Sequence, residues 1–274
     1  GRSAVTTNYG FSPISGTAWR WQIFLSALLA FCSEILLWTN PTRSIGEWLV
    51  LAVGYLALSG LLLELAARFR LRDPFGLLAL AGIYGMLNGL ILNPQTALFD
   101  VPRTLISRAM GAHAFAGLLA LTLFFGLAGI GLRTRRRLIA ALVLTAIFGI
   151  GWGLWGRWSP LVINEMSETP PETLAMYTIG GVVLVAAGLW LTQRSSVTAD
   201  ELRLSVPGWA FTLVVLVGLT VTYLLQGEIC TLSLIVIITL SAFSIMILIF
   251  QKRRKGAILL DGLMETPSGW RSLA

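Results

Sequence analysis

The chain has 274 residues, of which 56% are hydrophobic and only 12% are charged, and its mean hydropathy is +0.80. Soluble domains carry about 25% charged residues, so this composition excludes a water-soluble globular protein. The net charge of +7 would suit either nucleic acid or a lipid surface. Because the basic residues stand in short clusters at the ends of apolar blocks, we expect them to contact anionic lipid headgroups at the cytoplasmic face, and not nucleic acid.

Eight apolar blocks follow one another along the chain. Each has about the 20 residues that a helix needs to cross a hydrocarbon core of roughly 30 Å. Every backbone N–H and C=O group in lipid needs a partner within the protein, so we predict that the blocks are helices and the fold an all-α transmembrane bundle. The predicted spans cover residues 21–39, 46–66, 75–93, 110–132, 138–156, 174–192, 208–226 and 229–250.

These spans divide the chain into a polar N-terminal segment (1–18), an eight-helix transmembrane domain (19–251) and a basic cytoplasmic tail (252–274). The last two spans are joined only by residues 226–228, whose Gln-Gly-Glu sequence suits a tight turn. One helix could not replace the two spans, because the apolar stretch is about twice as long as a single crossing requires.

The distribution of Lys and Arg predicts that both termini lie in the cytoplasm. Positive residues are retained on the cytoplasmic side of a membrane. With eight spans, all but four of the 20 basic residues fall on the side of the termini. The four on the outer side are Arg43, Arg103, Arg108 and Arg157. We therefore predict a multi-pass protein of a cell membrane, expected to be a prokaryotic plasma membrane.

Glu34, in the first span, is the one acidic side chain that the hydropathy pattern places inside the hydrocarbon region. An ionisable group at that depth is costly unless it faces a cavity or a partner, so it marks a candidate functional site. There it could act as a protonation switch or as a cation ligand. The alternative is that the carboxylate lies about one turn below the outer surface, where it reaches water or pairs with Arg43.

Two predicted spans are rich in glycine. The third contains GIYGMLNG (82–89), with Asn88 inside it, and the fifth contains FGIGWGLWGRW (148–158). Small residues at such spacing let helix backbones approach closely, and close packing is the interpretation that we favour. The alternative is a bent or discontinuous helix that lines a central cavity, as in transporters, with the amide of Asn88 turned toward it.

His113, the only histidine, begins the fourth predicted span on the outer side, close in sequence to Arg103 and Arg108. It has no second His or Cys nearby, so it provides neither a metal triad nor a paired haem site. Cys32 and Cys230 lack the spacing of a zinc site or a disulfide framework. We predict an interfacial histidine in the first turn of a helix, with pigment ligation or proton acceptance as alternatives, and no cofactor.

Three functional hypotheses follow. The chain has no P-loop and no GxSxG or HExxH motif, and no lysine lies within a span to form a retinal Schiff base. The leading hypothesis is therefore a transporter or permease that moves a small solute through a Gly-rich helical cavity, rather than an enzyme. The second is a non-catalytic subunit or assembly factor that contacts other membrane subunits, and the third is a membrane enzyme acting on a lipid-linked substrate. The candidate substrate- or ion-binding residues are Glu34, Asn88, His113, Arg103 and Arg108.

Overall fold

The computed structural model describes residues 17–37, 43–98, 100–128, 170–192 and 195–263, together with 139 and 143. All regular structure within these ranges is helical, and they contain no strand. In chain order the helices are α1 (Ala18–Phe31), the π-helix η1 (Cys32–Leu36), α2 (Ile45–Arg68), α3 (Pro74–Ile91), α4 (Pro94–Ala97), the π-helix η2 (Leu105–His113), α5 (Ala114–Ala128), α7 (Pro171–Thr192), α8 (Val206–Leu225), α9 (Thr231–Arg253) and the 3₁₀ helix η4 (Leu259–Leu263).

Six helices in the described ranges are long and apolar enough to cross a membrane. They are α2, α3, the continuous helix η2–α5, α7, α8 and α9. The chain is therefore an integral membrane protein of the multi-pass type. The first predicted span corresponds to α1 continued by η1, whereas the fifth, at 138–156, lies outside the described residues except for positions 139 and 143.

Local hydrogen bonds define where several helices begin. Before α2, the Ser44 hydroxyl accepts from the backbone N–H of Glu47 at 3.3 Å, and the Glu47 carboxylate accepts from the backbone N–H of Ser44 at 2.6 Å. Asp73 caps α3 by accepting from the backbone N–H of Gly76 at 2.9 Å, and Pro74 supplies the first helical residue. Such caps satisfy N–H groups that have no partner within the helix.

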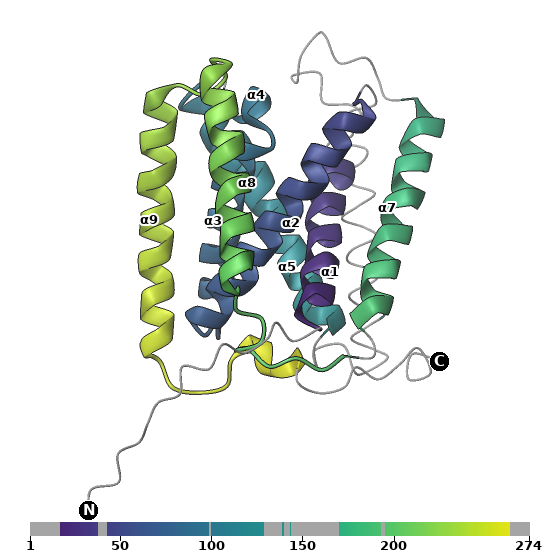
Figure 1. Cartoon of the computed structure of the whole chain (residues 1–274), viewed down its shortest axis with the longest axis vertical. Coiled ribbons are helices and arrows are strands. Elements are labelled where there is room, and N and C mark those ends of the chain that lie inside the picture. Colours follow the sequence, from purple (N-terminus) through teal and green to yellow (C-terminus); the bar gives the residue numbers. More distant parts are fainter. Residues whose placement is uncertain are drawn as a thin grey trace, which may run out of the picture.

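The centre of the bundle is formed by α1, α2, α3 and η2–α5, which hold its largest buried side chains, including Trp21, Tyr55, Tyr84 and Phe124. The other three long helices cover the flanks (Figure 1): α7 packs on α1, α9 on α3, and α8 on α2 and α3. Few residues of these flanking helices are buried, and in α8 only Thr212 is. Most of their apolar surface is therefore available to lipid or to partner helices.

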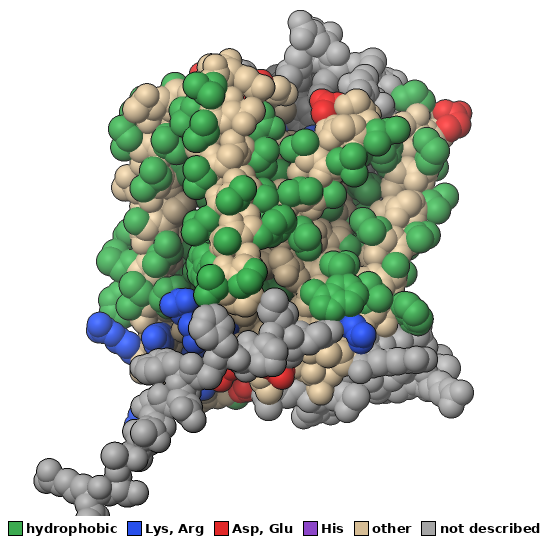
Figure 2. All heavy atoms as spheres, in the orientation of Figure 1, with side chains coloured by type: hydrophobic (Ala, Val, Ile, Leu, Met, Phe, Trp, Pro, Cys, Tyr) green, Lys and Arg blue, Asp and Glu red, His purple; other side chains and the backbone are tan. Residues whose placement is uncertain are grey.

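The Lys and Arg side chains that are visible in Figure 2 gather at the lower end of the helices, where α2 and α9 end and α8 begins. We call this the basic end. Buried Glu64 accepts there from Arg68 Nε at 2.7 Å and from the backbone N–H of Leu204 at 2.7 Å, which joins α2 to the start of α8.

The segment after α9 folds back against the basic end. Asp73 accepts from Gln251 Nε2 at 2.8 Å and pairs with Arg254 at 2.5 Å. Further along, the backbone N–H of Leu259 donates to the carbonyl oxygen of Leu71 at 2.8 Å. The start of the predicted cytoplasmic tail is thus held to the beginning of α3.

Candidate functional site

A cluster of polar side chains lies buried where α1 passes into η1, at the end of the bundle opposite the basic end. Its members come from η1, the residue pair before α2, α2 itself, α3 and the residues just after α3. We call it the Glu34 cluster, and it comprises Ser33, Glu34, Arg43, Tyr55, Tyr84, Asn88 and Asn93.

Both carboxylate oxygens of Glu34 have partners. Oε1 accepts from the Tyr55 hydroxyl at 2.5 Å and from Asn93 Nδ2 at 3.0 Å, while Oε2 forms an ion pair with the Arg43 guanidinium. The side chain of Glu34 is only 3% exposed and that of Arg43 is 12% exposed. A charge removed from solvent to this degree needs a counter-charge and hydrogen bonds, and Glu34 has both.

The hydrogen bonds continue from Glu34 into the bundle. Asn88 Nδ2 donates to the hydroxyls of Tyr55 at 3.0 Å and of Tyr84 at 3.1 Å, and Tyr84 shares a 2.5 Å hydrogen bond with Ser33 Oγ. Because Tyr55 accepts from Asn88 and donates to Glu34, each bond polarises the next. The result is a continuous polar path between Glu34 and Ser33 through otherwise apolar helices.

Two local features of the backbone place these side chains together. In η1 the backbone N–H of Leu37 donates to the carbonyl of Cys32, the i→i+5 pattern of a π-helix, which turns Ser33 and Glu34 toward α2 and α3. Isolated π-helical turns occur frequently at functional sites. At the end of α3, Pro94 cannot continue the helical hydrogen bonds, so the chain bends and Asn93 joins the cluster.

His113 lies at the end of the second π-helix, η2, and is 6% exposed. Its Nδ1 atom has no hydrogen-bond partner among the described residues, and the ring lies within electrostatic range of Glu34, Arg43 and Arg108. The structure places His113 at the ninth residue of η2, which begins at Leu105, and not in the first turn of a helix as the sequence predicts. The helix therefore carries His113 about two turns below its start.

The remaining predicted site residues divide between the cluster and the surface. Asn88 belongs to the Glu34 cluster, and Arg108 is partly buried on η2. Arg103 is 81% exposed and pairs with Asp100 at 3.5 Å, so it lies outside the cluster. The structure thus joins Glu34 to Asn88, places His113 near them, and leaves Arg103 at the lipid-facing or solvent-facing surface.

Several members of the cluster were not predicted as site residues. Tyr55 and Tyr84 are hydroxyl-bearing side chains in the middle of apolar blocks, and that position was the available signal. Asn93 precedes Pro94 and resembles an ordinary helix end, so the sequence carries no sign that it bonds Glu34. Arg43 was named only as an alternative partner of Glu34.

The glycines of α3 serve close packing at two of the predicted positions. A Cβ atom on Gly85 would overlap the carbonyl oxygen of Ala109 and lie 2.6 Å from the backbone nitrogen of Ala114. A Cβ atom on Gly89 would lie 3.0 Å from the Cβ of Ala109. These glycines therefore allow α3 to approach η2 and α5 closely. The second glycine-rich segment, 148–158, lies outside the described residues.

Within the described ranges, no three His, Cys, Asp or Glu side chains come close enough to hold a metal ion, and Cys32 and Cys230 are both free thiols. Comparison of the chain with protein-family models, curated proteins and solved structures finds no match in any of the three. Function therefore has to be inferred from the Glu34 cluster and its surroundings.

Proposed function

We propose that this chain is a transporter for a small solute in a prokaryotic plasma membrane, and that the Glu34 cluster is its coupling site. The observation that carries the proposal is a carboxylate only 3% exposed, paired with an arginine and bonded by side chains from α2 and the end of α3. Ionisable groups within membrane spans are expensive to maintain and mark proton, ion or substrate pathways.

The ion pair between Glu34 and Arg43 is the element that a substrate or proton can change. It connects η1 to the residues that begin α2. A proton on Glu34 removes its charge and releases Arg43, while an anionic solute group competes with Glu34 for the same guanidinium. Either event breaks the ion pair that holds η1 to the start of α2. Proton binding and solute binding are therefore coupled, because both act on the same contact.

The positive-inside rule places the basic end in the cytoplasm and both termini with it. Under this orientation the Glu34 cluster occupies the outer half of the bundle. Arg43 is the more exposed partner of the ion pair, so a solute from outside meets it first. The anionic headgroups of the inner leaflet then contact the Lys and Arg side chains at the basic end.

A second candidate function is a subunit or assembly factor of a larger membrane complex. The flanking helices favour it, because α8 buries only Thr212 and α7 buries only Gly181, Gly188 and Thr192. Such surfaces can pack against other membrane helices. The third hypothesis, an enzyme acting on a lipid-linked substrate, has less support, because Arg103 and Asp100 pair with each other at the surface instead of converging on Glu34.

Thermal unfolding of the purified protein tests the transport proposal. Amino acids, sugars, nucleosides, carboxylates and organic cations are added separately at millimolar concentration, since a ligand at about 100 times its dissociation constant stabilises the folded state by roughly 2.7 kcal/mol. We expect one solute class to raise the melting temperature of the wild type, and to be taken up by proteoliposomes that contain it.

The matched variants are Glu34→Gln and Glu172→Gln, which remove one carboxylate from the cluster and from an exposed site at the start of α7 respectively. The stabilisation and uptake should be lost in Glu34→Gln and retained in Glu172→Gln. The proposal fails if no solute class stabilises the wild type, or if Glu34→Gln responds and transports as the wild type does.

A further inference from the structure

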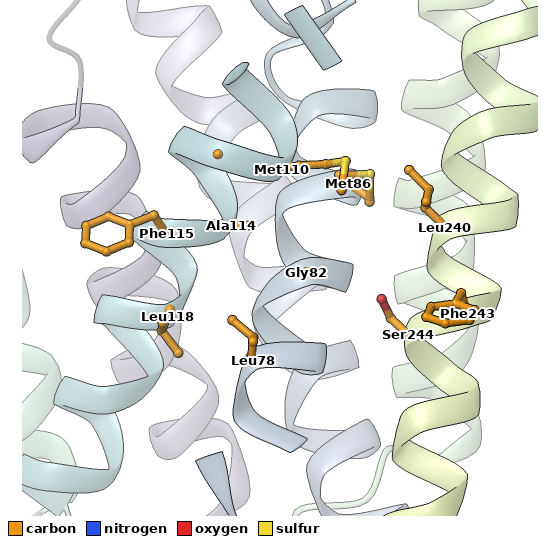
Figure 3. A pocket seen from close by; sticks show the side chains of 11 residues that line it. Leu78, Gly82, Met86, Met110, Ala114, Phe115, Leu118, Leu240, Phe243 and Ser244 are labelled. Atoms are coloured by element: carbon orange, nitrogen blue, oxygen red, sulfur yellow. The ribbon is translucent and has the colours of Figure 1, made fainter. Parts of the chain in front are cut away.

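An apolar cavity of about 340 Å³ lies between α3, η2–α5 and α9, apart from the Glu34 cluster. In Figure 3 the side chains of Leu240 and Ser244 extend from α9 toward α3, with Met86 and Met110 above and Leu78 below. The volume falls within the range of about 300–1,000 Å³ that is typical of ligand pockets. The cavity is therefore large enough to hold part of a small molecule.

The cavity opens to the lipid-facing surface of the bundle. Its lining residues Leu78, Met110 and Phe243 are 57%, 43% and 59% exposed. Among the described residues that line the cavity, Ser244 is the one with a polar side chain. An occupant must therefore be apolar over its inserted length, because the described part of the lining offers it no charged side chain and a single hydroxyl group.

An exposed arginine, Arg103, lies just before η2, one of the helices that line the cavity. Met110 and Ser107 are exposed on η2, and the Ser107 hydroxyl donates to the carbonyl of Arg103, two residues before the helix, at 2.9 Å. The Arg103 side chain pairs with Asp100 at 3.5 Å, and because both side chains are exposed, a lipid phosphate can compete for this guanidinium. Arg103 precedes Met110 by seven residues, so the two lie no more than about 10 Å apart along the helix axis, because 1.5 Å per residue is the rise of an α-helix and a π-helix rises less. Half of a hydrocarbon core measures about 15 Å, so a lipid chain with its headgroup beside Arg103 reaches the depth of the cavity.

We propose that this cavity binds one hydrocarbon chain of an anionic phospholipid from the leaflet that faces Arg103, with the phosphate near Arg103. Guanidinium groups suit phosphate oxygens, and basic sites between membrane helices bind anionic headgroups. This inference does not depend on the transport proposal, since it involves a different face of α3 and of η2.

The surroundings of Gly82 leave space for a larger side chain, so a substitution at this position can fill the cavity. A Cβ atom built on Gly82 meets only the Ser244 hydroxyl, at 3.5 Å, whereas one on Gly85 collides with backbone atoms. A leucine at position 82 therefore extends into the cavity without forcing the helices apart. Gly180, on α7, has nothing within 4 Å of such a Cβ atom and provides the matched control.

The experiment is native mass spectrometry of the purified protein with dioleoyl phosphatidylglycerol or dioleoyl phosphatidylcholine. We expect the wild type and Gly180→Leu to retain one phosphatidylglycerol molecule, and Gly82→Leu to bind it about tenfold more weakly, the equivalent of losing roughly two buried methylene groups. Arg103→Gln should bind the two lipids about equally. If Gly82→Leu does not fold, Ser244→Leu fills the same cavity from α9.

Two results would overturn the inference. One is equal retention of phosphatidylglycerol by the wild type and by a folded cavity-filling variant, which would place the lipid elsewhere. The other is equal retention of the two lipids by the wild type, which would rule out the phosphate contact with Arg103.

Discussion

Removing Arg43 tests whether the Glu34 cluster is held together by its ion pair. Arg43→Met keeps much of the side-chain volume but leaves the Glu34 carboxylate, 3% exposed, without a counter-charge. Breaking a buried pair from one side costs about 3–5 kcal/mol. The hydrogen bonds from Tyr55 and Asn93 remain, so we expect the lower part of that range, about 3 kcal/mol.

The double variant Glu34→Gln/Arg43→Met separates the charge effect from the loss of packing. A glutamine at position 34 still accepts from Tyr55 and Asn93, and no buried charge is left unpaired. We expect it to cost only about 1 kcal/mol relative to the wild type, because replacing both partners of a buried pair is often nearly neutral. The two substitutions should therefore be coupled by about 2 kcal/mol or more.

Thermal unfolding in detergent micelles, followed by the fluorescence of the ten tryptophans, measures these differences. By the scaling for chains of this size, Arg43→Met should lower the melting temperature by roughly 6–12 °C. Arg103→Gln, which breaks an exposed pair, is the control and should change stability by less than about 1 kcal/mol. An Arg43→Met variant as stable as this control, or strictly additive effects in the double variant, would refute the reasoning.

Three further predictions concern other parts of the bundle. The hydrogen bond from the Gly76 amide holds the pKa of Asp73 in the folded protein below its ordinary value of 3.8. The ionised cap therefore stabilises the protein fully above pH 3.8, and this stabilisation is lost as the pH falls through the pKa of the folded state. Asp73→Ala should cost about 1 kcal/mol at pH 7, and denaturation at a series of pH values should show the gap closing in acid. Gly85→Ala should destabilise the folded protein by about 1–3 kcal/mol, because its Cβ meets backbone atoms, whereas Gly82→Ala should have almost no effect. Equal melting temperatures for the two variants would contradict this packing. Hydrogen bonds from Ser233 lower the pKa of the exposed Cys230 thiol, which makes it more reactive. The proposed orientation puts Cys230 on the outer side, so a membrane-impermeant maleimide should label it in intact cells. Labelling only in inverted vesicles would reverse that orientation.

Much of the architecture could be predicted from the sequence because it depends on local properties of the chain. The length and apolarity of a block decide whether it forms a membrane-crossing helix, and caps such as Ser44 and Asp73 decide where that helix begins. For this reason α2, α3, α7, α8 and α9 lie within a few residues of the predicted spans. The unusual position of Glu34 was also visible, because an acid among apolar residues is a local signal.

Only the tertiary structure decided which groups meet. Tyr55, Asn88 and Asn93 are separated from Glu34 by 21 or more residues along the chain, and no periodicity within one helix determines that they converge on it. The π-helical turns of η1 and η2 add residues to single turns, which changes the direction of every later side chain and places His113 in the interior.

The same distinction separates two glycines of one motif. Gly82 and Gly85 are indistinguishable as small residues in an apolar block, yet one borders an open cavity and the other lies against the backbone of η2. The sequence by itself determined the helices and the membrane as their solvent, since both follow from the free energy of transferring each block into lipid. Side-chain packing between helices, which depends on distant parts of the chain at once, decided the polar cluster and the cavity.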